Sequence, residues 1–122
     1  MYYIIVVSDG TGRTAQQALD AALTQFEDTW VEIIVRSAIR TKHQVLEVVE
    51  EAVKKKAFIV HTLVSDDMRS LMLNHARKHN VETIDLMGPL LMRLSLQFAN
   101  APSEKPGLFN EVNKDYFRRI EA

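Results

Sequence analysis

The chain has no cysteine, and this excludes several kinds of chemistry. A disulfide framework, a thiol nucleophile and thiolate ligation of zinc all require cysteine. A chain without cysteine also agrees with a cytoplasmic location, which we expect for this protein.

The chain also lacks an excess of one charge. Lysine and arginine total 15 and aspartate and glutamate total 16, which leaves a net charge of -1. There is therefore no overall basic field for nucleic acid and no polybasic segment for a membrane surface. We predict neither partner, and any anion-binding site must be local.

Long apolar runs are missing as well. None approaches the roughly 18 residues that a membrane span needs. The first residues, "MYYIIVV", have neither the charged start nor the small-residue cleavage site of a signal peptide. With 122 residues, 47% hydrophobic and 25% charged, the composition suits one globular domain with a real core.

Four short apolar runs recur along the chain and predict strands: Tyr2 to Val7, Val31 to Val35, Phe58 to Thr62 and Thr83 to Met87. The first three are nearly continuous in valine, isoleucine and aromatic residues. Such runs are typical of strands that are covered on both faces of a parallel sheet.

Segments with helical periodicity follow these strands. Apolar residues recur at i, i+3, i+4 and i+7 within 15–26, 45–53 and 68–76. The order βαβαβαβα predicts an α/β fold, a Rossmann-like parallel four-stranded sheet with flanking helices and right-handed crossovers.

Helix starts carry sequence signals. Thr14 with Gln17, and Thr41 with Gln44, fit the capping box, in which a threonine and a glutamine each satisfy a backbone amide of the other. Ser65, followed by two aspartates, predicts a third cap at the positive end of a helix.

The C-terminal part differs in character. Residues 90–99 are apolar on more than one face, whereas "NAPSEKPG" is typical of an exposed linker. We therefore predict a domain over 1–99, a linker over 100–110, and over 111–122 the start of a helix leading into a missing C-terminal catalytic domain.

A helix that is apolar around most of its circumference must be covered. We predict a homodimer whose interface includes 90–99. The alternative is that a helix over 111–120 folds back over this segment within one chain.

The first predicted strand runs into the loop "SDGTGRT", Ser8-Asp9-Gly10-Thr11-Gly12-Arg13-Thr14. Glycines let a backbone approach a ligand closely, and a helix start offers unpaired N–H groups with a partial positive charge. Threonine and arginine side chains add donors. The loop therefore predicts a phosphate or carboxylate site, although a tight turn without a ligand would use similar residues.

Two nucleotide motifs can be compared with this loop. Gly10, Gly12 and Ala15 satisfy the loose dinucleotide pattern G-x-G-x-x-A, but Arg36 stands where an acidic residue would hold a ribose. Arg36 could suit a 2′-phosphate, whereas Asp9 would repel a pyrophosphate. The Walker pattern G-x-x-x-x-G-K-[ST] does not occur.

Other polar residues follow the remaining strands. Arg36, His61 and Ser65 are expected at the same edge of the sheet and join the candidate binding residues. Asp9 and His61 could form an acid/base pair, but a histidine at a strand end more often contacts backbone, which we favour. His75 and His79 lack the glutamate of H-E-x-x-H, so no metal site is predicted.

Five segments in this order resemble one known family: "VVSDGTGRTA", "IRT", "HTLVSDDMRSLM", "DLMGPLL" and "NKDYFRRIEA". Together they are similar to the N-terminal half of the pyruvate, phosphate dikinase regulatory proteins, a family that includes the phosphoenolpyruvate synthase regulators. The resemblance spans the whole chain, and it marks Ser8 to Gly12 as a family signature.

The resemblance implies a bifunctional enzyme. Members use ADP to phosphorylate a threonine of the dikinase or synthase, and inorganic phosphate to remove that phosphoryl group as pyrophosphate. Their P-loop belongs to the second half of the family's chain, and nothing in these 122 residues matches it. The resemblance therefore names ADP and phosphate as substrates of the parent family but assigns no catalytic residue and no cofactor to this chain.

A stand-alone α/β module that binds a small phosphorylated or carboxylated metabolite is the alternative function. A following P-loop segment in the parent gene would favour the regulatory enzyme.

Overall fold

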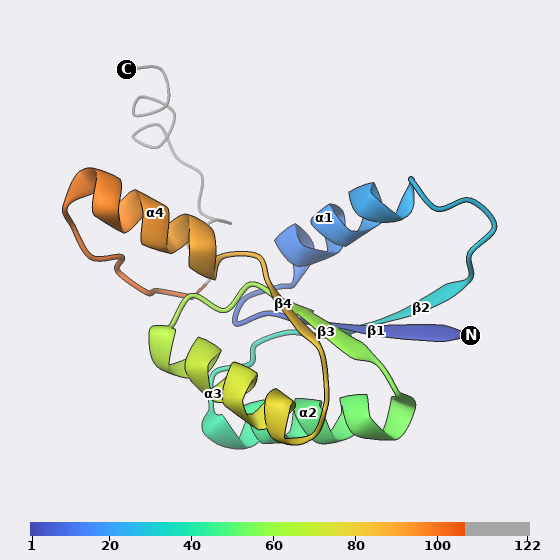
Figure 1. The fold of residues 1–122 in the computed structure, drawn as a ribbon. Helices are drawn as coiled ribbons and strands as arrows, with labels where there is room; N and C mark the ends of the chain where they lie inside the picture. Colours follow the sequence, from blue (N-terminus) through green and yellow to red (C-terminus); the bar gives the residue numbers. More distant parts are fainter. Residues whose placement is uncertain (107–122) are drawn as a thin grey trace.

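In the computed structural model, which describes residues 1–106, the chain forms a four-stranded parallel sheet with helices on both faces (Figure 1). The elements in chain order are β1 (Tyr2–Val7), α1 (Arg13–Leu23), β2 (Val31–Arg36), α2 (Lys42–Lys55), β3 (Phe58–His61), α3 (Asp66–Lys78), β4 (Thr83–Asp85) and α4 (Gly88–Phe98). The predicted Rossmann-like α/β fold and its element order are confirmed.

The strands are arranged in the order β2-β1-β3-β4, so the chain changes direction across the sheet at β1. Val7, the last residue of β1, is paired with Arg36 of β2 on one side and with His61 of β3 on the other. The topological switch point therefore lies between the carboxyl ends of β1 and β3.

Alternation along the strands divides the core into two layers. Ile5 and Val7 face α2 and α3, whose Val49 and Met72 are fully buried against the sheet. Ile4 and Val6 face the opposite side, where they pack against α1. Because both faces of β1 are covered, its sequence is continuously apolar rather than alternating.

Two of the three predicted caps are confirmed. The amide of Gln44 donates to Oγ1 of Thr41 (3.2 Å), and the Gln44 side-chain oxygen accepts from the Thr41 amide (3.0 Å). At the start of α3, the hydroxyl of Ser65 accepts from the amide of Met68 (3.3 Å).

The capping box predicted at Thr14 is wrong. Helix α1 begins one residue earlier, at Arg13, and its N-cap is Gly12 in the left-handed region (φ 87°). A Cβ atom at Gly12 would lie 2.9 Å from Cγ1 of Val35, so glycine is needed there for conformation and for space. The tight glycine turn thus moves Thr14 into the first turn of the helix.

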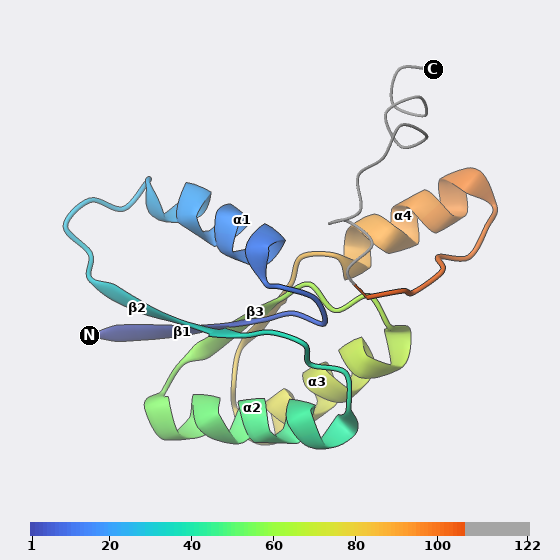
Figure 2. The same ribbon diagram turned by 180° about the vertical axis from the view of Figure 1, so that it is seen from behind.

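Helix α4 begins where the side chain of Asp85 turns the chain at the end of β4. Oδ1 of Asp85 accepts from the amides of Met87 (3.1 Å) and Gly88 (2.7 Å), which ends the strand two residues before the predicted position. A Cβ at Gly88 would lie 2.1 Å from Oδ2 of Asp85. From this point α4 projects away from the carboxyl edge of the sheet, as the two opposite views show (Figures 1 and 2).

After α4 the chain turns back toward α3. Residues 101–106 are exposed and lack regular structure up to a final turn, and Oε1 of Glu104 accepts from the amide of Asp66 (2.9 Å). The rest of the predicted linker and the helix predicted over 111–122 lie outside the described residues. Within the described part of the chain, no helix combines the length and apolarity that a bilayer crossing needs.

Candidate functional site

The loop that joins β1 to α1 occupies the switch point of the sheet. In open α/β sheets, ligands bind in the crevice outside the carboxyl ends of the strands at this place. The loop begins with the buried pair Ser8 and Asp9, and it reaches the surface at Thr11 and Arg13.

Backbone hydrogen bonds hold the first half of this loop to the segment after β2. Ser8 donates to the carbonyl of Arg36 (3.0 Å) and accepts from the amide of Ile39 (2.9 Å), while the carbonyl of Gly10 accepts from Ala38 (2.9 Å). The Ser8 hydroxyl also accepts from the amide of Gly10 (3.0 Å). The loop is therefore positioned before any ligand arrives.

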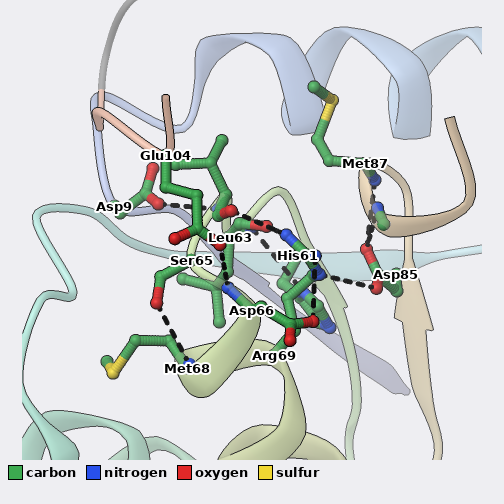
Figure 3. A network of polar contacts seen from close by, with 12 residues as sticks. Asp9, His61, Leu63, Ser65, Asp66, Met68, Arg69, Asp85, Met87 and Glu104 are labelled. Carbon is green, nitrogen blue, oxygen red and sulfur yellow. Dashed lines mark hydrogen bonds and ion pairs between the residues drawn. The ribbon is translucent and has the colours of Figure 1, made fainter. Parts of the chain in front are cut away.

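Asp9 ties the loop to the neighbouring strand. Its side chain is buried, and Oδ2 accepts from the amide of Val64 in the β3–α3 loop at 2.9 Å (Figure 3). Nε of Arg40 donates to the Asp9 carbonyl (2.9 Å). Burial raises the pKa of the Asp9 carboxyl, although the Val64 amide and the charges of Arg40 and Arg69 oppose this.

Two buried polar atoms at the switch point have no hydrogen-bond partner among the described residues: Oδ1 of Asp9 and Oγ1 of Thr62. Thr62 is fully buried, and alternation from Val60 places it on the face that α1 covers. An unsatisfied buried polar group costs about 1–3 kcal/mol. These atoms therefore mark a place where water or a polar ligand group is expected.

The N-terminus of α1 lies beside this place, and there Oγ1 of Thr11 accepts from the amide of Arg13 (3.3 Å). Gly12 supplies no side-chain cap and the first turn contains no acidic residue, whereas α2 and α3 are both capped by side chains. Thr11 and Arg13 are exposed and Thr14 is half-buried. The partial positive charge of the helix end is therefore available to an anion.

His61 lies on the other side of the switch point, almost fully buried. Its Nδ1 lies 3.5 Å from the amide of Leu63, so the expected contact with backbone is confirmed. Desolvation lowers the pKa of His61, and Arg69 acts in the same direction, while Asp85 opposes it. Burial therefore favours the neutral form of the imidazole. Asp9 and His61 do not form a hydrogen-bonded pair, since the Asp9 carboxylate binds Val64 instead.

Arg69 is the residue near this site that sequence reasoning missed. Nη1 donates to the carbonyls of Leu63 (3.3 Å) and Val64 (2.7 Å), and Nε lies 3.6 Å from Oδ2 of Asp85 (Figure 3). Arg69 thereby connects the loop after β3 to the start of α4. The i,i+3 spacing from Asp66, with which it forms an ion pair (3.3 Å), was the available signal.

Two other predicted site residues have structural partners. Nε of Arg36 donates to Oε1 of Glu51 on α2 (2.9 Å), and this pairing raises the pKa of Arg36. The hydroxyl of Ser65 caps α3. The structure therefore brings Ser8 to Thr14 together at the switch point and places Arg36 against α2.

The histidines of α3 do not form a metal site with neighbouring ligands. The rings of His75 and His79 meet edge to face with centroids 4.7 Å apart. Among residues 1–106, no group of three or more histidine, aspartate or glutamate side chains lies where it could hold a metal ion.

A parallel sheet with a positioned glycine loop at its switch point defines a Rossmann-like α/β domain. Comparison with known families is more specific, because the family model described as kinase/pyrophosphorylase matches residues 4–122. The chain belongs to this family.

Curated relatives agree with this assignment. A protein of Geobacter metallireducens named as a pyruvate, phosphate dikinase regulatory protein is 38% identical over all 122 residues. Proteins with the same name from Geobacter sulfurreducens and Shouchella clausii are 35% and 38% identical over 98% of the chain. The chain spans only 44–45% of the length of these three relatives.

Proposed function

We propose that this chain is the N-terminal domain of a cytoplasmic bifunctional enzyme that regulates pyruvate, phosphate dikinase or phosphoenolpyruvate synthase. The enzyme uses ADP to phosphorylate a threonine of its target and inorganic phosphate to remove that phosphoryl group. Membership of the kinase/pyrophosphorylase family and the names of the relatives support this proposal.

Within this function, the β1–α1 loop binds a phosphate-type anion. The observation that carries the assignment is the N-terminus of α1, whose N-cap Gly12 has no side chain, together with the buried Thr62 hydroxyl, which has no hydrogen-bond partner among the described residues. Amides of the loop and the first turn, with Arg13 as a charge-assisted donor, suit phosphate oxygens. The exposed position of Arg13 limits the charge contribution, so we expect weak binding.

Titration with inorganic phosphate, followed by NMR of the backbone amides, tests this assignment. Amides of Thr11 to Thr14 are expected to shift with saturation, and Arg13→Gln should weaken binding severalfold because it removes one cation. The matched control is Arg77→Gln, which changes an exposed arginine on α3. Shifts confined to other parts of the chain, or equal weakening by both variants, would contradict an anion site in this loop.

We also propose that the protein acts as a homodimer. Apart from Gly88, no residue of α4 is buried, and five large apolar side chains on this helix are exposed. Such a surface is typical of a protein–protein contact.

A further inference from the structure

The guanidinium of Arg69, near the start of α3, is engaged by protein groups. Its side chain is 14% exposed. Nη1 donates to the carbonyls of Leu63 (3.3 Å) and Val64 (2.7 Å), and Nη2 donates to Oδ1 of Asp66 (3.3 Å). Nε lies 3.6 Å from Oδ2 of Asp85. An arginine whose nitrogens are engaged in this way has little left to offer a ligand, so its contribution is to the position of the groups that it holds.

The peptide unit between Leu63 and Val64 lies between this guanidinium and the carboxylate of Asp9 (Figure 3). The carbonyl of this unit accepts from Nη1 of Arg69 (3.3 Å), and its N–H donates to Oδ2 of Asp9 (2.9 Å). A cation on the carbonyl polarises the peptide and makes its N–H a stronger donor. Arg69 and Asp9 thus form an ion pair that is bridged by a peptide unit.

The buried carboxylate of Asp9 depends on this bridge. Oδ1 has no hydrogen-bond partner among the described residues, whereas Oδ2 binds the Val64 amide. Burial raises the pKa of Asp9, the Val64 amide opposes this most strongly, and the charges that act on the carboxyl are those of Arg40 and Arg69. Arg40 is exposed, so solvent screens its charge. Arg69 is the more buried of the two cations, and it also holds the amide.

The Asp9 side chain attaches the β1–α1 loop on the β3 side of the switch point. On the β2 side, backbone hydrogen bonds hold Ser8 and Gly10. The amides that follow in the chain form the proposed anion site. Their position therefore depends on Asp9 and, through the peptide that Asp9 binds, on Arg69.

The start of α4 fixes the orientation of Arg69. The Asp66 carboxylate that binds Nη2 is 79% exposed, whereas the Asp85 carboxylate beside Nε is 32% exposed and therefore constrains the guanidinium more. Asp85 is itself held by the amides of Met87 and Gly88. A Cβ at Gly88 would lie 3.1 Å from Nε of Arg69, so the chain packs closely against this side chain.

We propose that Arg69 is a positioning residue for the anion-binding loop: it fixes the peptide that fixes the Asp9 carboxylate, and it thereby strengthens phosphate binding without contacting the anion. This inference rests on the anion site proposed above and adds a residue of α3 on which its affinity depends. A guanidinium suits this task better than an ammonium, because its planar fork directs several N–H groups at carbonyls and a carboxylate in fixed directions.

Replacement of Arg69 by glutamine tests the proposal in the 122-residue chain. Inorganic phosphate is titrated into the unmodified chain and into Arg69→Gln, and the backbone amides of the β1–α1 loop are followed by NMR. We expect severalfold weaker binding in the variant, because the attachment of Asp9 is loosened. The matched control is Arg77→Gln, which removes the same charge at an exposed position of α3 and should leave the affinity nearly unchanged.

The pKa of Asp9, measured from the chemical shift of its carboxyl carbon, separates positioning from a general loss of stability. In Arg69→Gln this pKa should rise further above its ordinary value, because the carboxylate loses a cation and a firmly held amide. Arg69→Lys keeps a cation and should bring the pKa back toward that of the unmodified chain. Its single ammonium cannot reproduce the fork, so phosphate binding should stay weakened.

The possible failures are distinguishable. If phosphate shifts the loop amides equally in the unmodified chain and in Arg69→Gln, the anion site stands and the positioning role of Arg69 is wrong. Weaker binding with an unchanged Asp9 pKa, or equal weakening by Arg77→Gln, would also overturn that role. If phosphate does not shift the loop amides of the unmodified chain, the proposed anion site is wrong and this inference falls with it.

Discussion

Asp9 follows β1 and His61 ends β3, and these two strands pair with each other. The two side chains nevertheless have different partners. The buried carboxylate of Asp9 accepts a hydrogen bond from the amide of Val64. This bond joins the loop after β1 to the loop after β3. His61 is equally buried but is surrounded by Asp85 and Arg69, which act on its pKa in opposite directions. Both residue types were expected at this edge, but their partners depend on side-chain direction.

The buried imidazole of His61 predicts a pH dependence of stability. Because the folded state lowers the pKa of His61 below its ordinary value near 6.5, the folded state binds fewer protons than the unfolded state. The free energy of unfolding therefore falls as pH decreases below about 6.5, and stability is retained above it. Urea unfolding at pH 7.5 and pH 5 should show that His61→Gln reduces this loss.

The matched control is His43→Gln, at an exposed histidine of α2. It should leave the pH dependence of unfolding close to that of the unmodified protein. If His61→Gln and His43→Gln changed the pH dependence equally, burial of His61 would not be its cause.

At the scale of the elements, the helix starts show when a local sequence pattern correctly predicts a cap. The capping boxes predicted at Thr14 and Thr41 follow the same pattern, and one of them forms. At Thr41 the chain enters the helix in an extended conformation (φ -121°, ψ 155°), which directs the hydroxyl at the Gln44 amide. At Gly12 the chain enters α1 through a left-handed residue (φ 87°), and a Cβ there would lie only 2.9 Å from Cγ1 of Val35.

This difference predicts unequal effects of two threonine substitutions. Thr41→Ala should reduce the free energy of unfolding by about 1 kcal/mol, because the Gln44 amide loses its acceptor. Thr14→Ala should change it by less than about 0.5 kcal/mol, since that side chain caps nothing. Urea unfolding of both variants measures the difference. Equal losses would show that Thr14 stabilises the start of α1 after all.

At the scale of the whole molecule, the chain contains a glycine loop after β1 but no Walker pattern. A nucleotide's terminal phosphates are normally held by the lysine of such a motif. We therefore expect the 122-residue chain neither to bind ADP tightly nor to transfer its phosphoryl group.

The assay incubates the chain with ADP and pyruvate, phosphate dikinase and measures phosphothreonine by mass spectrometry. The full-length relative from Geobacter metallireducens serves as the positive control. Phosphothreonine formed by the 122-residue chain alone would show that these residues contain a complete catalytic site.

The sequence by itself determined the strand and helix order, because apolar periodicity depends on which faces are buried. It also located the β1–α1 loop, since in a parallel sheet the residue after a strand must lie at the carboxyl edge. Only the tertiary structure decided that Arg36 pairs with Glu51, that Arg69 connects β3 to α4, and that α4 leads away from the sheet (Figures 1 and 2). These features depend on contacts between residues distant in sequence, whose directions follow from packing rather than from any local pattern.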